Sequence, residues 1–105
     1  MSQMEVVGVV IPEEVRQLAV EKGVETQLPT VLQAAREAFA GAHLSLLRQD
    51  DPEMPDESYI IIRVTDRTMT VGDALRAKDA YHRSLLGRVP TPLTWYFRLW
   101  PEIGG

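Results

Sequence analysis

Strand-forming patterns occur in four separate segments of the chain, each a short run of β-branched, aromatic or alternating apolar residues. The segments are residues 5–11, 43–48, 58–65 and 94–100. Proline and glycine mark their limits, because proline has no amide to donate to a sheet and glycine loosens a strand. We therefore predict four strands, with Gly8 as a bulge in the first and Pro101 as the end of the last.

Helical patterns lie between these strands, and each has a start or stop signal that local chemistry explains. The predicted helices cover residues 12–22, 26–40 and 71–87. Pro12 suits a first helical turn, and Gly23 suits the position just after a helix. Thr70 precedes Asp73 by three residues, the spacing of a capping box. Pro90 and Pro92 predict an extended connection after the third helix.

The order of these elements predicts the fold class. A β-α(α)-β-β-α-β chain is typical of an α+β two-layer sandwich with ferredoxin-like topology, here as one domain over residues 1–105. In the alternative, the first segment is only an arm and the core is α-α-β-β-α-β. The residues that we expect in the core share large apolar side chains on the inner faces: Leu28, Leu32, Phe39, Ile60, Ile62, Leu75 and Leu85.

The amino-acid composition is typical of a globular protein but does not indicate a function. The 105 residues are 45% apolar and 25% charged, which is typical of a globular protein. The absence of cysteine removes disulfides and thiolate metal sites and is consistent with a cytoplasmic protein. The N-terminal segment has no basic region, and its apolar run is too short for a signal sequence or a membrane span.

Charge is distributed unevenly along the chain. The net charge is −4, which argues against a general nucleic-acid-binding surface. Residues 1–57 contain four basic and eleven acidic side chains, whereas residues 58–105 contain seven basic and four acidic ones. The two parts therefore carry −7 and +3, a split that could let two copies of the chain attract each other or could be ordinary scatter.

The motifs of common enzyme and cofactor sites do not occur. No glycine-rich phosphate loop, G-x-S-x-G elbow or paired-histidine metal motif is present, so we predict no cofactor, no metal and no catalytic residue. The acidic segment 50–57 lacks the order of a calcium-binding loop. It is interpreted as a solvated hairpin loop, with an ion-binding or basic-partner site as the alternative.

Two titratable residues fall on the predicted apolar face of the helix 71–87. Helical spacing places Lys78 and His82 on the same side as Leu75 and Leu85. In one interpretation, their side chains cross the edge of the core and end in solvent or on backbone groups. In the other, they line a pocket that binds an anion or moves a proton. Its polar candidates are Lys78, His82, Arg63 and Tyr81.

Alternation along the strands also predicts a second sheet face of aromatic and arginine side chains. This face combines Arg63 with five candidate interface residues, which are Tyr59, Ile61, Tyr96, Arg98 and Trp100. Helices packed on one side of a sheet leave its other side uncovered, and such a patch usually marks an interface. We therefore predict a homodimer that buries this face. A different protein partner, a ligand platform and a partly wetted face of a monomer are the alternatives.

Three functions are consistent with these features. The first is a noncatalytic binding or assembly protein that acts through a protein–protein interface. The second is a dimeric α+β-barrel-like protein or enzyme that binds a small molecule near Lys78 and His82. The third is a nucleic-acid binder that uses the arginine and aromatic face, which the negative net charge disfavours.

Overall fold

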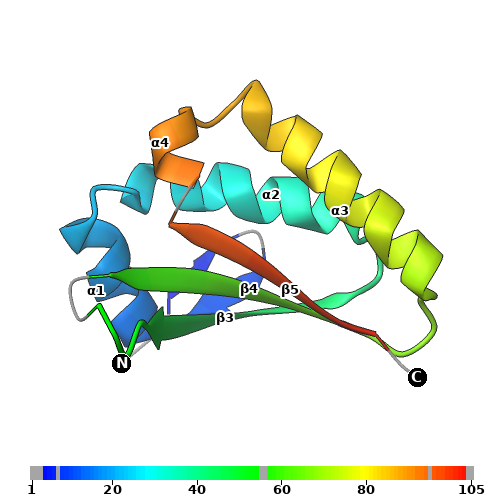
Figure 1. Ribbon diagram of the computed structural model, residues 1–105, viewed down its shortest axis with the longest axis horizontal. Coiled ribbons are helices and arrows are strands. Elements are labelled where there is room, and N and C mark those ends of the chain that lie inside the picture. The colour runs from blue at the N-terminus through cyan, green and yellow to red at the C-terminus, as the bar shows by residue number, and fades with distance from the viewer. Residues whose placement is uncertain (1–3, 7, 55–56, 95, 104–105) are drawn as a thin grey trace.

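A three-stranded mixed sheet packed against helices forms the body of the computed structural model, which describes residues 4–6, 8–54, 57–94 and 96–103 (Figure 1). The sheet contains β3 (His43–Asp50), β4 (Ser58–Asp66) and β5 (Phe97–Ile103), in that spatial order. β3 and β4 are antiparallel, whereas β4 and β5 are parallel. The α+β class predicted from the sequence is confirmed.

Three helices form where the local signals predicted them, and a 3-10 turn and an unpredicted short helix accompany them. They are α1 (Glu13–Glu21), the 3-10 turn η1 (Glu25–Gln27), α2 (Leu28–Ala38), α3 (Val71–Leu86) and the short α4 (Thr91–Thr94). The hydroxyl of Thr70 accepts a hydrogen bond from the Asp73 amide at 3.1 Å, so the predicted cap of α3 is present. Gly23 follows α1 with a φ of +69°, a conformation that glycine adopts without strain.

The N-terminal apolar segment forms a hairpin instead of the single strand predicted over residues 5–11. β1 (Met4–Val6) pairs with β2 (Val9–Ile11) in antiparallel register, and Gly8 lies in the turn between them with a φ of +75°. A tight hairpin turn needs such positive φ values, which explains the glycine. The two strands form a sheet of their own.

The position of this hairpin decides between the two topologies considered from the sequence. A ferredoxin-like sheet would include a strand from the N-terminal segment, but in the described residues the hairpin stays outside the three-stranded sheet. Apart from η1 and the short α4, the elements around that sheet follow the order α-α-β-β-α-β of the alternative interpretation. The hairpin nevertheless contributes to the core, because Val9 and Ile11 are buried in the main hydrophobic cluster.

One hydrophobic cluster joins the helices, the hairpin and a single face of the sheet. α2, α3 and α4 lie over this face in Figure 1, and α1 contacts β3 and β4. The sheet contributes every second residue of its strands to the cluster: Leu44, Leu46, Ile60, Ile62, Val64 and Phe97. Six of the seven predicted core residues are buried, and they are Leu28, Leu32, Phe39, Ile60, Ile62 and Leu85.

The prediction for Leu75 was wrong, because its side chain is 63% exposed. The buried face of α3 instead carries Ala74, Tyr81 and Leu85. These residues follow helical spacing as well as the predicted set does, and Tyr81 contributes the largest buried side chain. The helix is thus rotated about its axis relative to the prediction, so that the large ring of Tyr81 is removed from water.

The chain from Pro90 onward also departs from the prediction. Instead of an extended connection, Pro90 accepts the first hydrogen bonds of α4, and Pro92 lies in its first turn. β5 therefore begins at Phe97 and continues through Pro101 to Ile103. Proline is tolerated there because β5 lies at the edge of the sheet in the strand order β3-β4-β5.

Candidate functional site

The sheet face directed away from the helices is the candidate functional site, and we call it the open face. Strand register brings its side chains together from three strands. Leu47 of β3, Ile61 of β4 and Arg98 of β5 form one row across the sheet, and Arg63 and Trp100 lie side by side in the next. Tyr59 and Ile61 are buried, yet neither belongs to the main hydrophobic cluster, as expected for residues on the opposite face.

Arg98 covers the aromatic ring of Tyr59. Its guanidinium carbon lies 4.1 Å from the ring centroid, which is a favourable cation–π geometry. The Tyr59 hydroxyl donates a hydrogen bond to the Glu57 carboxylate at 2.7 Å, and this bond raises the pKa of Tyr59 above its ordinary value. These contacts help to keep Tyr59 only 8% exposed within a single chain.

A second charged pair crosses the same face. Nη2 of Arg63 donates to Glu102 at 2.8 Å, joining the central strand to the edge strand. Nε of Arg63 is buried without a hydrogen-bond partner among the described residues. The open face thus carries both signs of charge next to apolar side chains.

Two apolar side chains on the open face remain in contact with solvent. Trp100 is 52% exposed and Leu47 is 40% exposed, while Ile61, in the same row as Leu47, is only 3% exposed. Exposed aromatic residues flanked by arginine are the composition that protein interfaces favour. Four of the five candidate interface residues therefore share this face: Tyr59, Ile61, Arg98 and Trp100.

The fifth candidate, Tyr96, was wrongly assigned to this face. It precedes β5 and packs partly against the main hydrophobic cluster, with Nζ of Lys22 6.0 Å from its ring centroid. The prediction extended strand alternation back to residue 94, but α4 occupies Thr91–Thr94 and β5 begins only at Phe97, so strand alternation does not set the direction of Tyr96.

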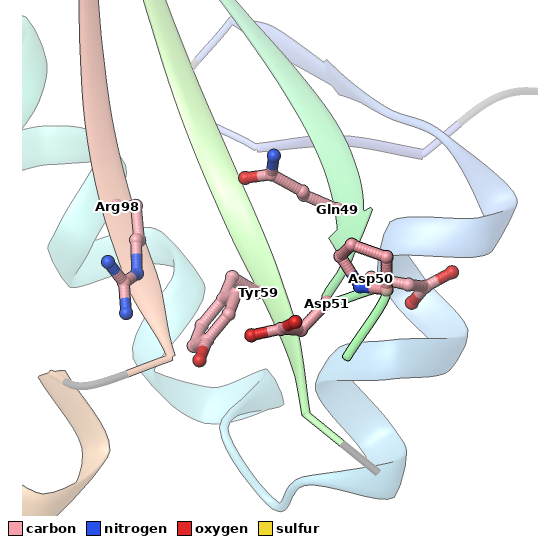
Figure 2. A pocket seen from close by; sticks show the side chains of 6 residues that line it. Gln49, Asp50, Asp51, Tyr59 and Arg98 are labelled. Carbon is pink, nitrogen blue, oxygen red and sulfur yellow. The ribbon is translucent and has the colours of Figure 1, made fainter. Parts of the chain in front are cut away.

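A hollow of about 230 Å³ lies at one end of the open face (Figure 2). Arg98 and Tyr59 reach it from β5 and β4, and Asp51 points toward it from the end of β3 (Figure 2). Gln49, Asp50 and Pro52 complete its lining. No sequence motif predicts this hollow, because its lining comes from three strands and a loop. The alternative interpretation of the acidic segment 50–57, a site for a basic partner, is the only sequence signal near it.

The acidic segment itself behaves largely as a self-contained hairpin loop. Oδ1 of Asp51 accepts hydrogen bonds from the amides of Glu53 and Met54, at 2.9 and 3.3 Å. The Asp51 amide donates to the Glu57 carbonyl, which closes the described part of the loop. Within the described residues, no three His, Asp or Glu side chains are grouped so as to hold a metal ion.

The four predicted pocket residues do not converge on one cavity. Arg63 lies on the open face, on the other side of the sheet from α3. Tyr81 is buried in the core, where its hydroxyl has no hydrogen-bond partner among the described residues and burial raises its pKa. Its ring meets that of His82 edge-on, with centroids 5.2 Å apart. Lys78 and His82 are exposed on the surface of α3.

Lys78 and His82 do face a groove, however, and we call it the α3–β5 groove. It has a volume of about 430 Å³ and runs between α3 and the edge strand β5. Its lining consists of Lys78, His82, Thr94, Phe97, Arg98 and Leu99. The helical spacing of Lys78 and His82, which singled them out in the sequence, places them together on its rim.

Comparisons with known proteins add no functional information. No family model matches the chain, and neither the curated proteins nor the solved structures show significant similarity to it. None of the helices in the described ranges has the length and apolar character needed to cross a membrane.

Proposed function

We propose that this protein is a noncatalytic binding or assembly protein that pairs with a second copy of itself through the open face. The observation that carries the proposal is the exposed Trp100, which stands beside Arg63 and one row from the half-covered Leu47 on a sheet face without helices. Covering this surface removes apolar area from water, which favours association.

A second copy is the occupant that the charge pattern favours. The open face carries arginine on β4 and β5 and Glu102 near the end of β5, and Asp51 lies beside it just after β3. A twofold axis brings each patch onto its counterpart, so one surface with both signs can be complementary to itself. The opposite net charges of the two parts of the chain support the same pairing.

Sedimentation velocity and light scattering over a micromolar concentration range test this proposal. We expect the mass of a dimer, and we expect Trp100→Ala to weaken association by about 2 kcal/mol, or roughly thirtyfold, because interface tryptophans often act as anchors. Leu86→Ala is the matched control, since Leu86 is also exposed but lies on α3.

Two results would reject the dimer. One is the mass of a single chain throughout the concentration range. The other is a dimer whose stability responds equally to the changes at Trp100 and at Leu86, which would place its interface elsewhere.

A further inference from the structure

We propose that the α3–β5 groove binds an extended acidic peptide segment of another protein, which adds to the sheet as a fourth strand beside β5. The groove shares Arg98 with the open face, whereas Lys78, His82 and the outer edge of β5 lie outside that face, and peptide binding is not needed for the dimer. The inference rests on three features of the groove: a strand edge that no described strand pairs with, a basic rim and an exposed apolar ridge.

The first feature is the backbone of β5. The amide of Ile60 donates to the carbonyl of Tyr96, and β4 pairs with β5 in parallel register. In this pattern, alternate residues of β5 direct their backbone groups toward β4, whereas those of Phe97 and Leu99 point to the other edge. Among the described residues no strand pairs with that edge.

Pro101 agrees with this assignment of the two edges and sets a limit to the added strand. It follows Leu99 by two residues, so its nitrogen also faces the unpaired edge, where a missing amide costs no hydrogen bond within the sheet. A peptide can therefore pair with β5 around Phe97 and Leu99 but loses one donor at Pro101. The expected ligand is a short segment, in the manner of peptides that augment sheet edges in other proteins.

The second feature is charge. Lys78 and His82 project from α3 on one side of the groove, whereas Arg98 of β5 lines the groove but directs its guanidinium onto Tyr59 at the open face. None of the described residues that line the groove is acidic. A carboxylate on the peptide would therefore meet Lys78 and His82 on the helix side of the groove, and this charge complementarity favours an acidic partner.

The third feature is an apolar ridge along the same side of α3. Val71, Leu75 and Leu86 are exposed, and helical spacing places them in line with Lys78 and His82. In β5, the side chains of Phe97 and Leu99 line the groove floor. A strand with apolar residues on one side of its backbone and acidic residues between them would contact both surfaces.

The test uses blocked heptapeptides of sequence Thr-Xaa-Glu-Xaa-Asp-Xaa-Thr, with valine, leucine or phenylalanine at the Xaa positions. Each is titrated into the full ¹⁵N-labelled chain and followed by NMR. We expect shifts of the amide signals of Leu99 and its neighbours in β5, and of Lys78 and His82. N-methylation of alternate peptide amides is expected to abolish binding, because it removes the hydrogen bonds of an added strand without changing the protein.

Protein variants separate the groove from other surfaces. Lys78→Glu combined with His82→Glu is expected to weaken binding at least about fivefold, since charge pairs of this kind contribute modestly. Arg67→Glu is the matched control, because Arg67 is exposed but is not part of the groove lining. Binding is expected to be the same in the Trp100→Ala variant, whether or not the dimer forms.

Three outcomes would overturn the proposal. They are no signal change with any of the three peptides at millimolar concentration, changes confined to residues outside α3 and β5, and unaltered binding after N-methylation. If the chain proves to be a monomer, the expected peptide results do not change. The two proposals can therefore be rejected independently of each other.

Discussion

The guanidinium carbon of Arg98 lies 4.1 Å from the centroid of the Tyr59 ring, so a charged side chain of the edge strand covers an aromatic residue of the central strand. This contact shows how one chain partly covers a sheet face that has no helices. Arginine is suited to it because its flat, weakly hydrated group stacks on a ring while its end remains in water.

Replacing Arg98 by alanine tests the contribution of this contact. We expect Arg98→Ala to lower the free energy of unfolding by about 0.5–1 kcal/mol, because the cation–π contact is lost and the Tyr59 ring is exposed. Urea denaturation gives the value. The control is Arg67→Ala, which removes an exposed arginine from a loop. An equal effect of the two changes would show that the stacking contributes nothing to stability.

Two tyrosines predict opposite effects of removing a hydroxyl group. The hydroxyl of Tyr81 is buried without a partner among the described residues, so Tyr81→Phe should raise the free energy of unfolding by about 1 kcal/mol. The hydroxyl of Tyr59 donates to Glu57, so Tyr59→Phe should lower it by about 1 kcal/mol. Thermal or urea denaturation of both variants is the measurement. Destabilisation by Tyr81→Phe would mean that its hydroxyl makes a hydrogen bond in the core.

Ile62 and Leu75 test which apolar residues form the core. Ile62 is fully buried under the helices, so Ile62→Ala should cost roughly 2–5 kcal/mol through lost contacts and the cavity left behind. Leu75 is mostly exposed, so Leu75→Ala should stay within about 0.5 kcal/mol of the unaltered protein. Chemical denaturation compares the two. A large loss at Leu75 would place the exposed ridge of α3 in an interface.

The hydrogen bonds of Asp50 should make part of the folding stability depend on pH in the acid range. Its carboxylate accepts hydrogen bonds from Ser58 at 2.5 Å and from Arg48 at 3.0 Å, and these hold its pKa below the ordinary value of 3.8. The Asp50 carboxylate binds a proton less readily in the folded state than in the unfolded state. Its hydrogen bonds therefore contribute their full stabilisation at pH values above the ordinary pKa of 3.8. This stabilisation is lost as the pH falls from there through the lower pKa of the folded protein.

Asp50→Asn should therefore make the decline in stability below pH 4 less steep, as measured by urea denaturation midpoints across the acid range. Glu53→Gln controls for the loss of one negative charge from the same loop. If both variants changed the slope equally, net charge rather than the Ser58 and Arg48 bonds would explain the effect.

Much of the secondary structure follows from signals that act over only a few residues. Thr70 caps α3 and Gly23 ends α1 because their geometry depends on the nearest backbone groups alone. Segment 58–65 becomes the central strand because its β-branched run suits a strand buried on both faces. The same alternation correctly placed Tyr59, Ile61, Arg98 and Trp100 on one face.

Features that depend on distant partners could not be predicted in this way. The seven residues from Glu5 to Ile11 fit one strand or two, and only pairing across Gly8 distinguishes a hairpin. Spacing on α3 allowed either Lys78 or Tyr81 to face inward, and packing against the sheet selected the side chain that has more apolar area to bury.

The sequence by itself determined where α1, α2, α3, β3 and β4 form, which residues alternate on the faces of β4, and that residues 1–57 and 58–105 differ in net charge. Tertiary structure decided that β5 is an edge strand, that its continuation through Pro101 is tolerated, and that Lys78 and His82 border a groove beside it. The physical reason is that local backbone preferences are encoded within a few residues. Edges, grooves and exposed faces exist only once segments far apart in the chain have packed together.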